Sequence, residues 1–292
     1  MKFKKFNKGV LSSSTGAFFW GFLGTYYFKY ITFVGTLEVV IHRCIWTSLF
    51  LFITCLIFKK MNLVKKNLLN YKNLTVLFIT SILIFANWTI WIYAVEKNKI
   101  IDASFGYFIF PIISVFFGYI FFKENLNKKK IFSLFLVLVS IIYLLVSFNE
   151  FPWIGVSVAL LWSTYNLLRK KIDVDTDIGL FIESIFFTPV AIILFYYLYI
   201  NNLNYFSLND IPLMFLLILA GPMTVIPLFL YVYGVKLTGL GPSGMIFFIT
   251  PTGQFLLGFF YYNEPFSVDK FLSFILIWFA VSIYLRDLYE NN

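Results

Sequence analysis

Ionisable side chains are scarce in this sequence: 13% of its 292 residues are charged, and it contains one histidine and two cysteines. Hydrophobic residues make up 60% and the mean hydropathy is +0.85, which excludes a soluble globular domain. The sequence also lacks an H-E-x-x-H motif, a P-loop and a G-x-S-x-G motif. We therefore expect a membrane protein that is not an enzyme and uses no metal or other cofactor.

Long apolar tracts fill most of the chain. Tracts long enough to cross ~30 Å of hydrocarbon as helices lie near residues 9–28, 36–58, 73–95, 103–122, 131–148, 152–168, 178–199, 211–233, 242–262 and 268–285. The first follows four lysines, as in a signal peptide, but no A-x-A-type cleavage site follows it, so we expect a retained span. Cys44 and Cys55 share one tract, and a separation of ~16 Å along a helix is too large for a disulfide.

The net charge of +9 arises from cationic clusters between the tracts, which is typical of cytoplasmic loops and not of a nucleic-acid-binding surface. Eighteen of the 23 Lys and Arg lie in the N-terminus, in the loops at 59–72, 123–130 and 169–177, at Lys236 and at Arg286. The opposite face receives only Lys29, Lys97, Lys99 and Lys270. This asymmetry predicts that both termini are cytoplasmic.

The two halves of the sequence repeat each other. A shift of 140 residues superposes Tyr93 on Tyr233, Phe108 on Phe248, Pro111 on Pro251 and Glu124 on Glu264, and a slightly different shift places Trp20 on Trp162. Because each unit has five tracts, an odd number, the second unit begins on the opposite side of the membrane. The sequence therefore predicts an all-α membrane protein of ten transmembrane helices in two inverted five-helix repeats, residues 1–148 and 149–292, an architecture typical of transporters.

Several stretches at corresponding places resemble the RarD branch of the EamA family, in the drug/metabolite transporter superfamily. They are Leu37-Glu38, His42-Arg43-Cys44-Ile45-Trp46, Asn87-Trp88, Ala94-Val95, Ala103-Ser104-Phe105-Gly106-Tyr107-Phe108 before Pro111, Leu168-Arg169-Lys170-Lys171, Ala220-Gly221-Pro222 and Glu264-Pro265. The resemblance implies a ten-helix permease of the bacterial inner (plasma) membrane with a central cavity between its halves. Phe247-Phe248-Ile249 and Gln254 depart from the more polar or Tyr-containing segment usual in the family, and the resemblance indicates no single substrate.

Ionisable groups at membrane depth are costly, so each is a candidate for coupling or gating. Glu38, His42 and Arg43 lie in the first two turns of the second tract, with Glu38 and His42 on one helical face. The cluster either binds a charged group or relays a proton, or it is a structural pairing with Arg43 reaching the outer interface. Glu183 opens the seventh tract as Glu38 opens the second, and is either a gate or a carboxylate held by its helix N-terminus and nearby lysines.

Polar or amphipathic side chains inside the tracts are candidates for binding the solute or lining its cavity, because such groups need a partner or water. They are Trp20, Asn87, Trp88, Trp91, Tyr107, Tyr165, Asn166 and Gln254, with Trp162 as a further member. Pro111 and Pro251 recur at matching mid-helix positions and are candidate hinges, since a proline frees a backbone carbonyl.

Together these features favour a secondary active transporter of a small metabolite or drug-like solute. Without an ATP-binding motif, transport runs downhill or is coupled to an ion, and Glu38, His42 and Glu183 favour the proton. The expected partners are the solute, membrane lipids and protons, and not nucleic acid. Two other functions stay open: an intramembrane lipid-modifying enzyme and a non-transporting membrane scaffold.

Overall fold

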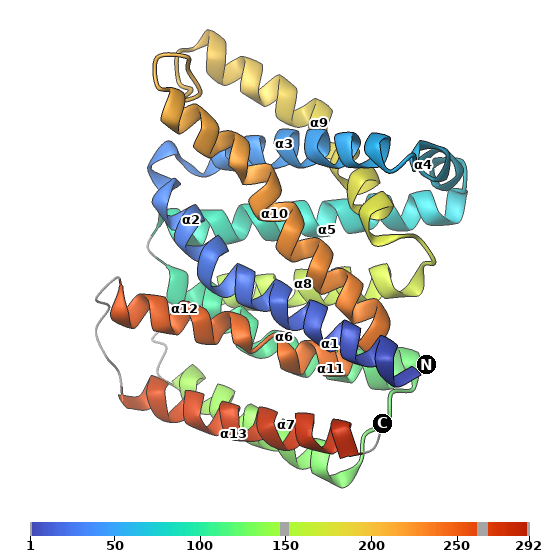
Figure 1. Ribbon diagram of the computed structural model, residues 1–292. Helices are drawn as coiled ribbons and strands as arrows, with labels where there is room; N and C mark the ends of the chain where they lie inside the picture. Colours follow the sequence, from blue (N-terminus) through green and yellow to red (C-terminus); the bar gives the residue numbers. More distant parts are fainter. Residues whose placement is uncertain (1, 98, 147–151, 262–267, 291–292) are drawn as a thin grey trace.

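The computed structural model describes residues 2–97, 99–146, 152–261 and 268–290, and within these ranges it contains helices and no strands (Figure 1). In chain order the elements are α1 (Lys2–Phe19), the π-helical segment η1 (Trp20–Gly24), α2 (Thr25–Tyr30), the short 3₁₀ helix η2 (Thr32–Val34), α3 (Thr36–Ile57), α4 (Met61–Leu68), α5 (Tyr71–Glu96), α6 (Ile100–Phe122), α7 (Lys128–Val146), α8 (Trp153–Lys171), α9 (Thr176–Ile200), α10 (Ile211–Thr238), α11 (Leu240–Ile246), α12 (Ile249–Phe260) and α13 (Val268–Glu290).

Apolar segments form helices here because lipid offers no hydrogen bonds to an exposed backbone. Among the described residues, six helices are long and apolar enough to cross a membrane: Thr36–Ile57, Tyr71–Glu96, Ala103–Phe122, Thr176–Ile200, Ile211–Thr238 and Phe271–Glu290. Other helices fall short for local reasons. Helix α1 begins with four lysines in its first seven residues, and α11 and α12 have only 7 and 12 residues.

The ninth predicted tract is split into α11 and α12 at Phe247 and Phe248. Pro251 explains the break, since it has no N–H for the carbonyl of Phe247 and its ring clashes with that carbonyl. The backbone N–H of Thr250 instead donates to the Phe247 carbonyl, at 2.8 Å. Pro251 therefore lies in the first turn of α12 and not at mid-helix as predicted, whereas Pro111 does lie inside an unbroken α6.

Helix α4 occupies the segment that the sequence analysis treated as a loop, residues 59–72. Val64 is buried, while Lys65 and Lys66 on the other side are exposed. The preceding Lys60 donates to the Asp177 carboxylate at 2.5 Å, at the start of α9. This contact, together with the basic face, makes α4 a short surface helix at one end of the molecule.

The helices pack in pairs that join distant parts of the chain (Figure 1). Helix α1 lies along α10, α6 along α8, and α7 along α13, while α3 packs on both α9 and α10. Two apolar clusters result: a small one among α6, α7, α11 and α13, and a large one that includes α3, α5, α8, α9 and α10. The large cluster contains the cavities described below.

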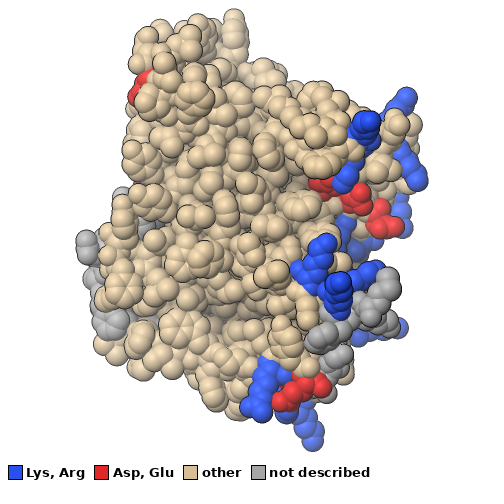
Figure 2. All heavy atoms as spheres, viewed as in Figure 1, with Lys and Arg blue, Asp and Glu red and all other residues tan. Residues whose placement is uncertain are grey.

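The outer surface is apolar over most of its area. Phe132, Phe135 and Ile142 of α7 and Ile193 of α9 are each at least half exposed, an arrangement suited to lipid and not to water. Figure 2 shows the visible Lys and Arg gathered at the end of the molecule where α4 and both termini lie. The chain is thus an all-helical, multi-pass membrane protein whose basic residues gather at one end.

Candidate functional site

A small cavity lies inside the large apolar cluster, where the two halves of the chain meet. It offers about 40 Å³ to the centres of water-sized molecules, which is enough for water but not for a drug-sized solute. Six of its thirteen lining residues are aromatic, and the complete set is Gly16, Trp20, Arg43, Ile84, Asn87, Trp88, Tyr107, Trp162, Thr224, Pro227, Leu228, Tyr231 and Phe247.

Arg43 supplies the charge of this cavity. Its side chain is 0% exposed, and its Nε donates to the Thr224 hydroxyl at 3.1 Å. The guanidinium carbon lies 4.4 Å from the ring centre of Phe28, 4.7 Å from that of Trp88 and 5.4 Å from that of Trp20. Both Nη1 and Nη2 are buried without a hydrogen-bond partner, and Arg43 has no ion-pair partner among the described residues. The cavity therefore holds a cation whose two terminal donors are unsatisfied.

Two tryptophans that the repeat superposes face the cavity from opposite halves. Trp20 donates from Nε1 to the Tyr107 hydroxyl at 3.2 Å. Trp162 packs against Phe247, the residue 140 positions after Tyr107, with ring centres 6.1 Å apart. Phe247 has no hydroxyl, and Nε1 of Trp162 is buried with no hydrogen-bond partner among the described residues. A phenylalanine at the position that matches Tyr107 thus leaves a third unsatisfied donor group among the lining residues, besides Nη1 and Nη2 of Arg43.

The π-helical segment η1 sets the position of Trp20, its first residue. The Thr25 hydroxyl donates to the Trp20 carbonyl at 3.0 Å. Gly21 lies so close to α12 that a Cβ there would stand 2.8 Å from the Thr250 carbonyl oxygen. Single π-helical turns recur at functional sites, and this one brings Trp20 to the cavity while α1 packs on α12.

Helix α5 contributes a further part of the cavity wall. Asn87 and Trp88 line the cavity, and Asn87 Nδ2 donates to the Val158 carbonyl at 3.2 Å. Trp91 is not among the lining residues; it is 1% exposed and packs on Trp20 with ring centres 5.2 Å apart. Of the predicted cavity residues, Trp20, Asn87, Trp88, Tyr107 and Trp162 therefore line this cavity, whereas Trp91 and Tyr165 do not.

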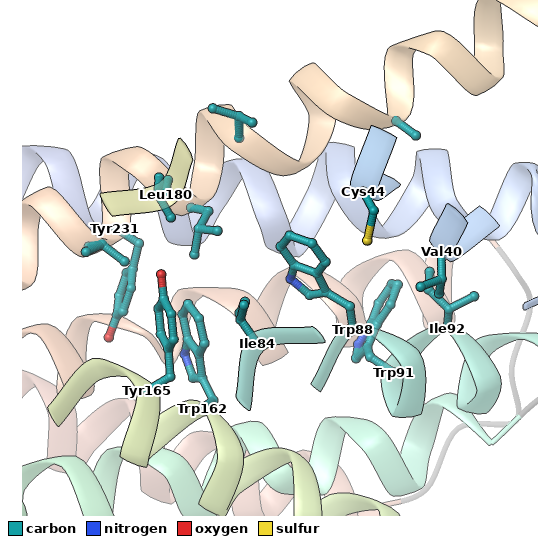
Figure 3. Close-up of a cluster of buried hydrophobic side chains, with 14 of the residues drawn as sticks. Val40, Cys44, Ile84, Trp88, Trp91, Ile92, Trp162, Tyr165, Leu180 and Tyr231 are labelled. Atoms are coloured by element: carbon teal, nitrogen blue, oxygen red, sulfur yellow. The ribbon is translucent and has the colours of Figure 1, made fainter. Parts of the chain in front are cut away.

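A second, smaller cavity adjoins the first and shares Ile84, Trp88 and Leu228 as common walls. It offers about 20 Å³ to water-sized molecules and is lined by Cys44, Thr47, Leu51, Ser81, Ile84, Phe85, Trp88, Leu180, Glu183, Ser184, Phe187, Val225 and Leu228. Figure 3 shows Ile84 and Trp88 between the stacked Trp162 and Tyr165 on one side and Cys44 on the other. The two cavities are compartments separated by a few side chains.

Glu183 is the charged residue of the second cavity, and it is fully paired. The carboxylate accepts from the Thr80 hydroxyl at 2.6 Å and from the Tyr165 hydroxyl at 3.1 Å, and Arg169 Nε lies 3.4 Å away. Arg169 also donates from Nη2 to the Thr176 carbonyl at 3.2 Å. The sequence analysis placed Arg169 in a cytoplasmic loop; it is instead 1% exposed at the end of α8.

Glu38 and His42 line neither cavity. The Glu38 carboxylate accepts from the backbone N–H groups of Tyr205 at 2.8 Å and Phe206 at 3.0 Å, in the loop between α9 and α10. His42 Nδ1 accepts from Trp46 Nε1 at 3.0 Å, so neutral His42 carries its proton on Nε2, 3.5 Å from Glu38. The predicted cluster therefore divides, and only Arg43 reaches the cavity.

The remaining predicted residues make hydrogen bonds within one helix or between helices. Asn166 is 1% exposed and donates to the Trp162 carbonyl of its own helix at 2.8 Å. Gln254 accepts from the Ser104 hydroxyl at 3.0 Å and donates to the Thr25 hydroxyl at 3.2 Å, which joins α12 to α6 and α2. Neither is among the residues that line the two cavities.

Thr224 and Tyr231 are cavity residues that sequence reasoning missed. Both lie on α10, and Thr224 sits between two prolines in an otherwise apolar run, a signal of the same kind as Asn87. Over the ranges that the structure describes, no group of three or more His, Cys, Asp or Glu could hold a metal ion, and Cys44 and Cys55 are free thiols.

Comparison with known proteins identifies the family. The sequence profile of the EamA-like transporter family matches twice, over residues 7–146 and 152–286. The chain belongs to the EamA-like transporter family. This EamA chain is 31% identical to protein RarD of Escherichia coli (strain K12), over 98% of its length and 97% of the relative, and 30% identical to the uncharacterized transporter YojE of Bacillus subtilis (strain 168), over 97% and 95%.

A more distant relative, 23% identical over 85% of this EamA chain and 84% of its own length, is the chloramphenicol-sensitive protein RarD of Pseudomonas aeruginosa. A solved crystal structure has the same fold, with a TM-score of 0.69, 14% identity and coverage of 94% of each chain. The predicted resemblance to RarD-like EamA members is confirmed, and the chain is a membrane transporter by family.

Proposed function

We propose that this chain is a secondary active transporter that carries a small metabolite or drug-like solute across the bacterial plasma membrane by alternating access. The observation that carries the proposal is the Arg43 cavity. Trp20 and Trp88 line it from the first family-matched segment, and Trp162 and Tyr231 line it from the second. In transporters built from inverted repeats, the solute site lies at the interface of the repeats.

The proposal includes ten membrane crossings arranged as two inverted five-helix repeats, residues 1–148 and 149–292. The packing supports it. The repeat pairs α1 with α8, α5 with α10, α3 with α9 and α7 with α13. Helix α1 packs on α10, and its repeat equivalent α8 packs on α5, the equivalent of α10. Helices α3 and α7 pack on their own repeat equivalents, α9 and α13. Such reciprocal contacts are what a twofold axis between two similar units produces.

The orientation we propose has the basic end, with α4 and both termini, in the cytoplasm. The gathering of Lys and Arg at that end supports it (Figure 2), because cytoplasmic segments are enriched in these residues. The first cavity is too small for a solute in this conformation. Transport then requires the helices to separate first on one side of the membrane and then on the other. Trp88 lines both cavities and lies on the path between them.

For coupling we propose the proton, with Glu183 as its site. Glu183 is the one acidic residue among the described residues that line the two cavities, whereas Glu38 and His42 line neither. Protonation of Glu183 would break its ion pair with Arg169. That change would loosen the contact between α8 and α9 and so link proton binding to helix movement.

The test is transport by the purified protein in liposomes that contain a pH-sensitive dye. The solutes are amino acids, nucleosides, aromatic acids and chloramphenicol, the last because of the name of the Pseudomonas aeruginosa relative. We expect at least one solute to accumulate when a proton gradient is imposed. The double variant Arg169→Gln/Glu183→Gln should still exchange this solute across the membrane but lose accumulation driven by the gradient, and Glu38→Gln should retain both.

Folded, reconstituted protein that moves none of these solutes would count against transport. Mass spectrometry of the liposome lipids then separates the two other functions: altered lipids would indicate a lipid-modifying enzyme, and unchanged lipids a scaffold.

A further inference from the structure

Two residues that line the first cavity carry hydrogen-bond donors that no described residue satisfies. The donors are Nη1 and Nη2 of Arg43 and Nε1 of Trp162, and both side chains are more than nine-tenths buried. A buried donor without a partner costs free energy, and a buried charge without one costs far more. Since all three groups are donors, the missing partner is an acceptor.

The charge of the cavity specifies the acceptor further. An arginine stays protonated in proteins, and no Asp or Glu is among the described lining residues. Arg43 is also the only Lys or Arg in that set. One cation without a counter-ion balances a single negative charge. The planar fork of a guanidinium matches a carboxylate, which accepts two parallel N–H bonds.

Apart from Asn87, which donates to the Val158 carbonyl, and Thr224, which donates to the Ala220 carbonyl, the rest of the lining is apolar or aromatic. Tyr231 donates its hydroxyl to the Ser243 carbonyl at 3.0 Å, and the Tyr107 hydroxyl is held by Trp20, so both rings present mainly carbon to the cavity. Trp88 and Phe247 add two more ring surfaces. A solute that fills such a site has an apolar or aromatic body.

We propose that the solute of this transporter is a monocarboxylate with an apolar or aromatic body, whose carboxylate binds Arg43 with help from the indole N–H of Trp162. This inference rests on the proposed transport function and narrows its substrate class. An ammonium group on the solute would find no carboxylate in the cavity. Acids without an amino group are therefore favoured over the corresponding amino acids.

The test is binding to the purified, ligand-free protein, followed by tryptophan fluorescence, because Trp20, Trp88 and Trp162 line the cavity. The probes are benzoate, octanoate and 3-phenylpropanoate, with 3-phenylpropanamide, 3-phenylpropylamine and phenylalanine as matched neutral, cationic and zwitterionic compounds. We expect at least one carboxylate to bind, the amide and the amine to bind much more weakly, and phenylalanine to bind less tightly than 3-phenylpropanoate.

The variant Arg43→Gln should weaken carboxylate binding ~30-fold or more, since it removes one partner of a buried charged pair. Arg43→Lys should recover part of the affinity, because it keeps the charge without the fork. Arg286→Gln removes the same charge from a side chain that is 82% exposed and should change nothing.

The inference is overturned if no carboxylate binds the folded protein, if the amide binds as well as the acid, or if Arg43→Gln keeps the affinity. A solute transported independently of Arg43 would overturn it while leaving the transport function in place. Carboxylates that bind through Arg43 but never cross the liposome membrane would support the site and count against transport.

Discussion

Arg43 and Glu183 are each the eighth residue of their helices, α3 and α9, and the repeat shift of 140 residues places one on the other. Both side chains are buried, and each lines one of the two adjoining cavities. Their surroundings are opposite: Glu183 has three partners, whereas the terminal nitrogens of Arg43 have none in the part of the chain that the structure describes. Removing each charge should therefore have a different effect on the stability of the protein.

Arg43→Gln should stabilise the ligand-free protein. The substitution removes a buried charge without a counter-ion, and this gain should outweigh the lost contacts with the rings of Phe28 and Trp88. We expect the apparent Tm to rise by ~2 °C or more in a thermal unfolding assay in detergent. A drop in Tm would mean that the guanidinium is already satisfied within the protein and would weaken the case for a ligand.

Glu183→Gln should destabilise the protein, because it leaves Arg169 charged, buried and without its counter-ion. Breaking a buried pair costs on the order of 3–5 kcal/mol. The double variant Arg169→Gln/Glu183→Gln should recover more than half of that loss. A double-mutant cycle of apparent stabilities measures the coupling, and additive single effects would contradict the ion pair.

Glu38→Ala should loosen the loop between α9 and α10 without affecting the cavity. It removes the acceptor of the Tyr205 and Phe206 N–H groups, each an interaction with a charged group of about 1.5–3 kcal/mol. Hydrogen exchange should speed up at those two amides, while binding at the Arg43 cavity stays unchanged. Loss of binding in this variant would instead indicate that Glu38 contributes to the solute site.

Phe247→Tyr tests the unpaired indole of Trp162. The new hydroxyl would give Nε1 the partner that Trp20 finds in Tyr107, and we expect a gain of about 0.5–1.5 kcal/mol in stability. Carboxylate affinity should fall, since the donor is then occupied. Phe248→Tyr is the matched control: its ring packs against Phe108 in the smaller cluster, where a hydroxyl should destabilise without changing binding.

The sequence predicted the elements better than the site. Apolar length and the cost of a charge in lipid pointed to the helices and to Arg43. Helical geometry already separates Arg43 from His42 by ~100° around the axis, so the division of the predicted cluster follows from local structure. The partners do not: Thr224 is 181 residues from Arg43, and the loop amides bound by Glu38 lie more than 160 residues away. Such contacts depend on helix packing.

Arg169 shows a second limit of sequence reasoning. A basic run at the end of an apolar tract is typical of a cytoplasmic loop, and Lys170 and Lys171 continue that run. One residue earlier in the same helix, Arg169 faces inward to Glu183. The charge pattern indicates where a transmembrane span ends. It does not indicate which of the basic residues there has its side chain buried in the interior.

The break between α11 and α12 has no equivalent in α6, although α6 contains the matching proline. Pro111 stands in α6 where Pro251 stands in α12, and it likewise cannot donate to the carbonyl four residues before it, that of Tyr107. Suppose that each repeat takes up the conformation of the other during a transport cycle. We then expect α11 and α12 to join into one continuous helix and α6 to bend at Tyr107. Spin labels placed at the two ends of α6 would then report a shortening in the state facing the other side of the membrane.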